Sequence, residues 1–307
     1  MAILSMVRGG AKYIYSNDPE SIEGVSLGST NGRYTIEVTL QPNIDYHTEF
    51  YHLNVSGGTL RIGIAVQNGN STSQQIRVKS KAIATGGSPY SQIASGVTRD
   101  YGNSSNDQYI TIPGNGTILL HYADVLGGNM VNGKVKFATG ASNLKVRVFF
   151  ARTSVSTNNI FNLPRATSDG KQRTTGFFNY DTRYANVNAS TVSNFYLSAY
   201  QDNINEYETG TNVLGSQKLL GNYGIIYDLQ FQNASGKRLR ITPNEQAHTW
   251  WTAQIVLWTS NNQWYRTTEI NKSSSTKYWL MAIPADQKIR YILPGGNYGN
   301  IFFEIIN

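Results

Sequence analysis

The five tryptophans of this chain lie within 30 residues of its second half, and they are the side chains best suited to bind a ligand. If residues 248–258 form one strand, the even positions place Trp250, Gln254 and Trp258 on one face, opposite an apolar face. A flat indole can stack on the C–H face of a sugar ring while neighbouring amides bond its hydroxyls. The full set of tryptophans is Trp250, Trp251, Trp258, Trp264 and Trp279.

We therefore predict a ligand surface on the second half, formed by Trp250, Trp258, Trp264, Gln254 and Tyr265. The alternative is that Trp250 and Trp258 are covered by the other half of the chain or by a neighbouring subunit. Exposed aromatic residues mark protein interfaces as well as sugar sites. The sequence leaves both interpretations open, a glycan platform and a structural interface.

No other residues have the spacing and context of a catalytic site. Residues 24–28 fit the G-x-S-x-G pattern of a hydrolase, but that device needs a helix directly after it, and residues 29–32 are typical of a turn. Glu206 and Glu208 would stand about 7 Å apart on an extended strand, within the range of a glycosidase pair. Their polar neighbours favour a solvated loop instead. Because the chain also lacks a cysteine nucleophile, we predict no catalytic residues and no enzymatic activity.

The histidines do not have the spacing of a metal site. His47 and Glu49 share one face of a predicted strand, but a zinc or copper site needs three or four converging ligands, and His121 is distant in sequence. Calcium accepts mixed oxygen ligands, although no spaced calcium loop is present. We predict no metal and no cofactor, with Ca²⁺ as the one alternative. Its candidate ligands are Asp18, Glu20 and Glu23.

Short alternating segments recur along the chain, and they predict its fold class. Apolar and polar residues alternate over runs such as 33–40, 60–66 and 144–150, and clusters of Gly, Asn, Asp or Ser close these runs. Helical periodicity is almost absent. This pattern is typical of a sandwich or barrel built from many short strands. We predict an all-β protein of antiparallel β-sandwiches, jelly-roll or immunoglobulin-like.

An internal repeat sets the predicted number of domains. Residues 51–55 and 60–62 resemble residues 227–231 and 239–241, and both pairs read as hairpins. An Ile-Pro pair, a Gly-Gly-Asn triplet and a late strand then follow in the same order in each half. We predict tandem related domains at 1–152, including an N-terminal arm, and at 170–307, which is rich in tryptophan. Residues 153–169 read as the linker between them.

Two segments resemble secreted surface modules of Gram-positive bacteria. They are residues 12–20, Lys-Tyr-Ile-Tyr-Ser-Asn-Asp-Pro-Glu, and residues 293–300, Leu-Pro-Gly-Gly-Asn-Tyr-Gly-Asn. These motifs are turns and strand starts, and the family has no settled activity. The resemblance therefore implies a location at the cell surface more than any chemistry.

Composition and charge agree with a protein that works outside the cell. Only 15% of residues are charged, against about 25% in an average soluble protein, and the net charge of +7 is dispersed, so we predict no nucleic-acid partner. No apolar run is long enough for a membrane helix, and the first residues do not read as a signal peptide.

We predict a non-catalytic, extracellular or cell-surface protein whose partners are copies of itself or a surface polysaccharide. It would act as a self-assembling structural subunit or an adhesive module, or alternatively as a glycan-binding module. Residues 2–7 are the candidate strand donor for assembly, because an exposed sheet edge can accept an extended segment from another subunit.

Overall fold

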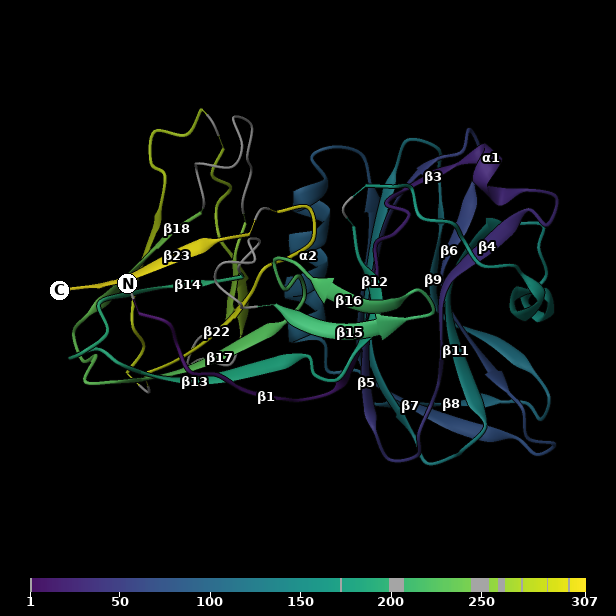
Figure 1. Ribbon diagram of the computed structural model, residues 1–307, viewed down its shortest axis with the longest axis horizontal. Helices are drawn as coiled ribbons and strands as arrows, with labels where there is room; N and C mark the ends of the chain where they lie inside the picture. The colour runs from purple at the N-terminus through teal and green to yellow at the C-terminus, as the bar shows by residue number, and fades with distance from the viewer. Residues whose placement is uncertain are drawn as a thin grey trace.

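The computed structural model describes residues 2–171, 173–198, 207–243, 254–258, 263–271, 273–285, 287–297 and 299–307, with Trp258 described by its backbone alone. Two β units lie side by side along the longest axis, and a helix lies between them (Figure 1). The predicted all-β class is confirmed. No helix among these described residues is both long and apolar enough to cross a membrane.

The first unit is a sandwich of two facing sheets. Its strands are β2 (Lys12–Ser16), β4 (Gly32–Thr39), β5 (Asp45–Val55), β6 (Leu60–Asn68), β7 (Gln74–Gly86), β8 (Gln108–Ile112), β9 (Thr117–Val125), β10 (Met130–Thr139) and β11 (Leu144–Arg152). One sheet has the order β2-β5-β10-β7-β8 and the other β4-β11-β6-β9. Their inward aliphatic and aromatic side chains form one buried core. The short β3 (Ser21–Glu23) pairs with the end of β5 and leads into α1 (Gly24–Leu27).

The second unit repeats this strand order. Its strands are β13 (Thr182–Asn188), β14 (Asn194–Leu197), β17 (Ile226–Gln232), β18 (Arg238–Thr242), β19 (Val256–Trp258), β20 (Trp264–Arg266), β21 (Trp279–Ala282), β22 (Lys288–Ile292) and β23 (Ile301–Ile306). The sheets run β13-β17-β22-β19-β20 and β14-β23-β18-β21, which matches the first unit position by position. The first two neighbours are parallel in both units. Apart from that added first strand, each unit has the strand order of a jelly roll.

The proposed sequence repeat corresponds to this topology in one feature out of four. Residues 51–55 and 60–62 lie in β5 and β6, and residues 227–231 and 239–241 lie in the equivalent strands β17 and β18. Neither pair is a hairpin, because each chain crosses from one sheet to the facing sheet. The Ile-Pro pairs and Gly-Gly-Asn triplets lie between non-equivalent strands, and the late strands, β10 and β23, are not equivalent either.

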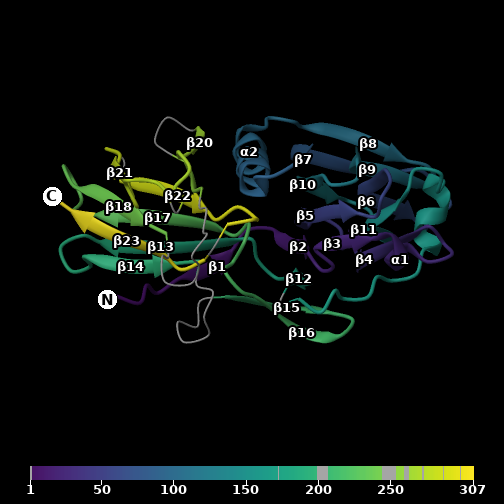
Figure 2. The same ribbon diagram turned by 90° about the horizontal axis from the view of Figure 1, so that it is seen from above.

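Strands cross the predicted domain boundary in both directions. β1 (Val7–Gly9) pairs with β13 of the second unit. In return, β12 (Thr175–Phe178), β15 (Glu208–Asn212) and β16 (Gly215–Leu219) continue the larger sheet of the first unit beyond β2 (Figure 2). The segment 153–169 is not a free linker, since it contains η1 (Thr157–Asn162) and buries Ile160 and Leu163 against the first unit. Because these two residues are apolar, the segment packs on the first unit instead of extending into solvent.

The N-terminal arm is already docked on its own chain. Ala2 forms a bridge to Phe195, and Leu4 and Met6 pack against the core of the second unit. The segment predicted to donate a strand to other subunits is therefore bound to the second unit of its own chain. It would have to dissociate from that unit before it could pair with another copy.

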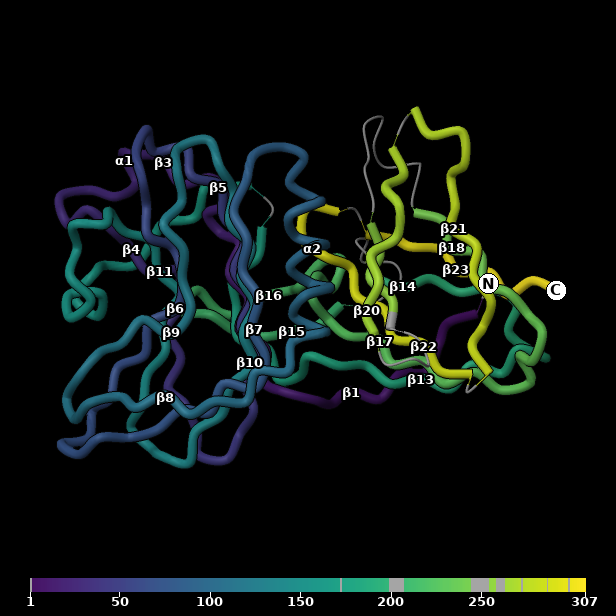
Figure 3. Tube along the Cα trace, turned by 180° about the vertical axis from the view of Figure 1, so that it is seen from behind, coloured from purple at the N-terminus to yellow at the C-terminus, as the bar shows by residue number. Residues whose placement is uncertain are grey.

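The longest helix among the described residues was not predicted. α2 (Tyr90–Asn103) connects β7 to β8, lies over β7 and β10, and touches β20 of the second unit (Figure 3). Its buried face consists largely of small side chains, among them Ser91, Ala94, Ser95 and Thr98. Such a face gives little apolar periodicity, so the sequence pattern does not stand out.

Candidate ligand-binding groove

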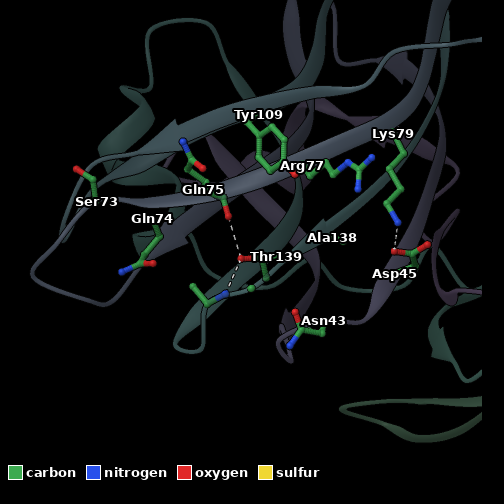
Figure 4. A pocket seen from close by; sticks show the side chains of 12 residues that line it. Asn43, Asp45, Ser73, Gln74, Gln75, Arg77, Lys79, Tyr109, Ala138 and Thr139 are labelled. Carbon is green, nitrogen blue, oxygen red and sulfur yellow. Dashed lines mark hydrogen bonds and ion pairs between the residues drawn. The ribbon is translucent and has the colours of Figure 1, made fainter.

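An open groove crosses the outer face of the larger sheet of the first unit (Figure 4). Its floor includes one row of residues on four adjacent strands. Asp45 of β5 pairs with Ala138 of β10, Ala138 with Arg77 of β7, and Arg77 with Tyr109 of β8. Three spacings of about 4.8 Å make this row about 14 Å long.

Small residues create the hollow, whose volume is about 740 Å³. Ala138 sits in the row between longer side chains, and Gly140 and Ala141 follow it in the turn. Thr139 Oγ1 donates a hydrogen bond to the carbonyl of Gln75 at 2.9 Å and accepts one from Ala141 N at 3.1 Å. These bonds tie the turn to β7 and hold the groove open.

Amides, hydroxyls and one aromatic ring line the groove. Tyr109 is 63% exposed, and the Arg77 guanidinium lies 5.9 Å from its ring centroid. An exposed aromatic ring beside neutral polar groups can combine stacking with hydrogen bonding to hydroxyls. The neutral polar side chains are Asn43, Ser73, Gln74, Gln75 and Thr139.

The charges around the groove are paired with one another. Lys79 Nζ lies 2.6 Å from Asp45 Oδ1, and Arg77 makes two hydrogen bonds of 2.6 and 2.7 Å to Asp107. The bond to Arg77 lowers the pKa of Asp107. The charged groups that border the groove are thus neutralised in pairs.

Of the five residues predicted to form a tryptophan platform, the three whose side chains the structure describes do not share one exposed surface. Trp264 is 7% exposed and Gln254 is 2% exposed, whereas Tyr265 is 43% exposed. Trp250 lies outside the described residues, and the backbone of Trp258 pairs with that of Trp264 in the β19–β20 hairpin. The first unit covers Trp264. The interface interpretation predicted such a covering for Trp250 and Trp258.

The indole of Trp264 lies against Gly102 at the end of α2. A methyl group on Gly102 would overlap the indole, while one on Gly96 of the same helix would meet nothing within 4 Å. Asn103 completes the contact, donating from Nδ2 to the carbonyl of Trp264 and accepting from its amide at 2.8 Å. Gln254 joins the same interface through a hydrogen bond with Ser95.

These two glycines give a matched test of the contact. We expect Gly102→Ala to lower the free energy of unfolding by about 1–3 kcal/mol, the cost of overpacking. Gly96→Ala should raise it by up to about 1 kcal/mol, because alanine favours the helix and has room. Chemical denaturation of both variants measures the difference. Equal effects from the two would mean that Trp264 does not pack on α2.

A second polar cluster is buried where the two units meet. Glu49 accepts hydrogen bonds from Lys134, from Tyr13 at 2.9 Å and from Asn132 at 3.2 Å, and both charged side chains are fully buried. Burial lowers the pKa of Lys134, while Glu49 acts in the opposite direction. Gly224 of the second unit comes so close that a β-carbon there would strike Glu49 and Tyr13. This cluster is therefore enclosed at the junction of the two units.

His47 lies beside this cluster, with its ring centroid 4.8 Å from that of Tyr13. Its Nδ1 lies 3.3 Å from Asp181 Oδ2 without forming a well-shaped hydrogen bond, and its ring stacks on Tyr101 with centroids 4.8 Å apart. Burial lowers its pKa, although Asp181 opposes that shift. His121 lies elsewhere and bonds the carbonyl of Ala82 at 2.9 Å. His47, Glu49 and His121 therefore do not form the three-ligand convergence that a zinc or copper site would need.

The described residues contain no group of three or more histidines and carboxylates that could hold a metal. Two of the three acids considered for Ca²⁺ have protein partners. Asp18 accepts a hydrogen bond from Asp169 N at 3.1 Å, and Glu20 pairs with Arg173.

Sequence reasoning did not find the groove. The sequence indicates the groove only weakly. Residues 77–81 place cations on one face of a strand, and Tyr109 stands in an alternating segment. What joins them is the register of β7 against β8, which no local pattern reveals.

Comparisons with known proteins add little. No family model and no curated protein matches the sequence. Among solved structures, the CUB1-EGF-CUB2 domain of human MASP-1/3 is 5% identical over 99% of this chain and 100% of that one, with a TM-score of 0.20. The PBSX exported protein XepA is 8% identical over 89% and 85%, with a TM-score of 0.19. A laccase mutant from B. aclada is 8% identical over 88% of this chain and 50% of its own, with a TM-score of 0.21.

The first two of these structures are distant β-sandwich-like domains. Scores this low carry no argument about function. No sequence family supports the resemblance to Gram-positive surface modules.

Proposed function

We propose that the protein is a non-catalytic, extracellular adhesive module that binds a surface polysaccharide in the groove beneath Tyr109. The observation that carries the proposal is the combination of an exposed aromatic ring with amides and hydroxyls around an open hollow of about 740 Å³. An open groove suits a chain that extends past both ends of the site, as a polysaccharide does.

The polarity of the groove supports a neutral or weakly charged glycan. Its cations are already paired with Asp45 and Asp107, which leaves little net charge to attract a polyanion. The neutral side chains Asn43, Gln74 and Gln75 can both donate and accept hydrogen bonds, which matches the hydroxyls of a sugar. A low fraction of charged residues and abundant amides are consistent with a protein that works outside the cell.

Loss of the aromatic ring should abolish most binding without unfolding the protein. We expect Tyr109→Ala to weaken retention by about tenfold, as for an aromatic contact worth about 1.5 kcal/mol. The melting temperature should change by no more than a few degrees, because the side chain is largely exposed. Retardation in native gels containing soluble polysaccharides, preceded by a glycan array, measures the effect.

Tyr122 provides a matched control. It is 43% exposed, the Arg61 guanidinium lies 5.2 Å from its ring, and Arg61 pairs with Asp124, as Arg77 does with Asp107. It stands on β9, in the opposite sheet. If Tyr122→Ala weakens binding as much as Tyr109→Ala, or if neither does, the groove is not the site.

A further inference from the structure

A second, smaller groove follows the open edge of β4. Its volume is about 410 Å³, and it lies between residues 34–39 of β4 and the strands β12 and β15, which reach over from the second half of the chain. The larger sheet continues past β2 with these added strands, while the facing sheet ends at β4. The smaller sheet is therefore shorter at this edge, and the overhanging strands face the space beside it.

The backbone of β4 offers hydrogen-bonding groups to this groove. Leu40 N donates to Leu144 O at 2.9 Å, and the same antiparallel ladder pairs Val38 with Val146. Because alternate residues of a strand point to opposite neighbours, the amides of Glu37 and Thr39 point away from β11 and into the groove. Within the described part of the chain, no strand pairs with this edge beyond a single bridge.

That single bridge shows how another segment can pair with the edge of β4 through backbone hydrogen bonds. Tyr34 N donates to the carbonyl of Pro164 at 3.1 Å, and Ala166 N donates to the carbonyl of Tyr34 at 2.7 Å. The segment 164–166 thus begins a strand on β4 and then leaves it. The rest of the edge, from Ile36 to Thr39, lines the open groove.

Arg165 supplies a cation at the end where this bridge stops. It lines the groove and is partly exposed, and among the described residues no carboxylate lies within ion-pair distance of it. The carboxylate of Glu37 is already held by Arg147 at 2.6 Å and by Lys145 at 3.2 Å. The groove therefore has one uncompensated positive group beside a row of backbone donors and acceptors.

The overhang also limits what can enter. A second copy that paired its own β4 edge here would bring its whole sheet and its own overhang into the space that β12 and β15 occupy. A lone extended segment meets no such obstacle. Along the floor it would contact Phe177, Thr211 and Val213, a mixed surface with two apolar side chains.

We propose that this groove binds an extended peptide, which adds to β4 as a fifth strand and places a carboxylate on Arg165. Backbone hydrogen bonds to Glu37 and Thr39 would provide much of the affinity, as in other cases of strand addition. Alternate apolar side chains of the peptide would pack on Phe177 and Val213. This peptide site is separate from the glycan groove, which lies on the other sheet.

Fluorescence anisotropy with defined peptides tests the proposal. The probe is a labelled heptapeptide of alternating threonine and valine that ends in aspartate with a free carboxyl group. We expect saturable binding to the full chain, and no binding of a peptide in which alternate threonines are replaced by proline, which has no amide hydrogen. A peptide ending in asparagine amide should bind about tenfold more weakly, having lost its charged bonds to Arg165.

Three substitutions locate the binding. Arg165→Glu should weaken binding of the aspartate peptide by at least about tenfold, so that this peptide no longer binds more tightly than the amide peptide. Thr211→Trp, at an exposed position, should fill the groove and abolish binding of both peptides. Lys171→Glu makes the same charge change at an exposed residue outside the groove and should leave binding unchanged.

Two results would overturn the proposal. One is the absence of saturable binding, or binding that neither Arg165→Glu nor Thr211→Trp reduces while both variants keep the wild-type melting temperature. The other comes from light scattering of the protein alone: a dimer that Thr211→Trp converts to a monomer would identify a second copy as the occupant.

Discussion

Replacing Lys134 by methionine is expected to lower the free energy of unfolding by about 3–5 kcal/mol, because the substitution leaves the Glu49 carboxylate buried without its cation. Urea denaturation followed by far-UV circular dichroism and by tryptophan fluorescence measures the loss. All five tryptophans lie in the second half, so fluorescence reports that unit separately. Because the pair lies at the junction of the units, both signals should shift to lower urea concentration together.

Two further variants separate the buried charge from general damage. Lys134→Met combined with Glu49→Leu removes both charges and should recover much of the lost stability. Arg61→Met breaks the exposed ion pair with Asp124 and should lower the free energy of unfolding by less than about 1 kcal/mol. A Lys134→Met variant that loses no more than Arg61→Met would show that the Glu49–Lys134 pair does not contribute to holding the units together.

Mild acid is expected to destabilise the protein through its buried histidines. His52 is fully buried, and burial lowers its pKa to about 4 from an ordinary value of about 6.5. Between these values the unfolded chain binds a proton that the folded chain does not, so stability falls as the pH falls. From pH 7 to pH 5 the loss from His52 alone should be about 2 kcal/mol. Burial also lowers the pKa values of His47 and His121, which adds to the loss.

The pH dependence of His52→Gln isolates this contribution. His52 Nδ1 lies 2.7 Å from the carbonyl of Pro19 and Nε2 lies 3.0 Å from Ser16 Oγ. Because a carbonyl oxygen can only accept, the neutral ring carries its proton on Nδ1. The variant should be less stable at pH 7 but should lose about 2 kcal/mol less between pH 7 and pH 5. Urea midpoints at half-unit intervals give both curves. Parallel curves for the two proteins would exclude His52 as the source of the acid sensitivity.

Local alternation was enough to predict the sheets but not their connections. Residues 60–66 and 144–150 are strands because their apolar residues alternate, and those residues do lie in the core. The same pattern made residues 51–62 look like a hairpin. Alternation tells which side chains face the core, and it is the same whether the next strand pairs with the last or crosses to the opposite sheet. Only the packing of the whole sandwich decides between them.

The candidate site was harder to predict for the same reason. Tyr109 and Arg77 become neighbours through strand register, and the groove depends on Ala138, which is unremarkable in the sequence. The tryptophans were conspicuous, yet Trp264 is covered by Gly102, a residue of a helix that small side chains concealed. Residue type indicated what could bind a sugar, but exposure depends on contacts between segments far apart in the chain.

The exchange of strands between the units bears on how the protein is made. While a ribosome extends the chain, the first jelly roll can close its core once β11 has emerged, but β2 still presents a bare edge until β12, β15 and β16 are synthesised. β1, in turn, has no partner until β13 appears. During this interval the nascent chain carries an unpaired edge and an unpaired strand, each able to associate with a neighbouring nascent chain. Slow translation after residue 152 would therefore favour aggregates, and chaperone capture at this stage would favour the monomer.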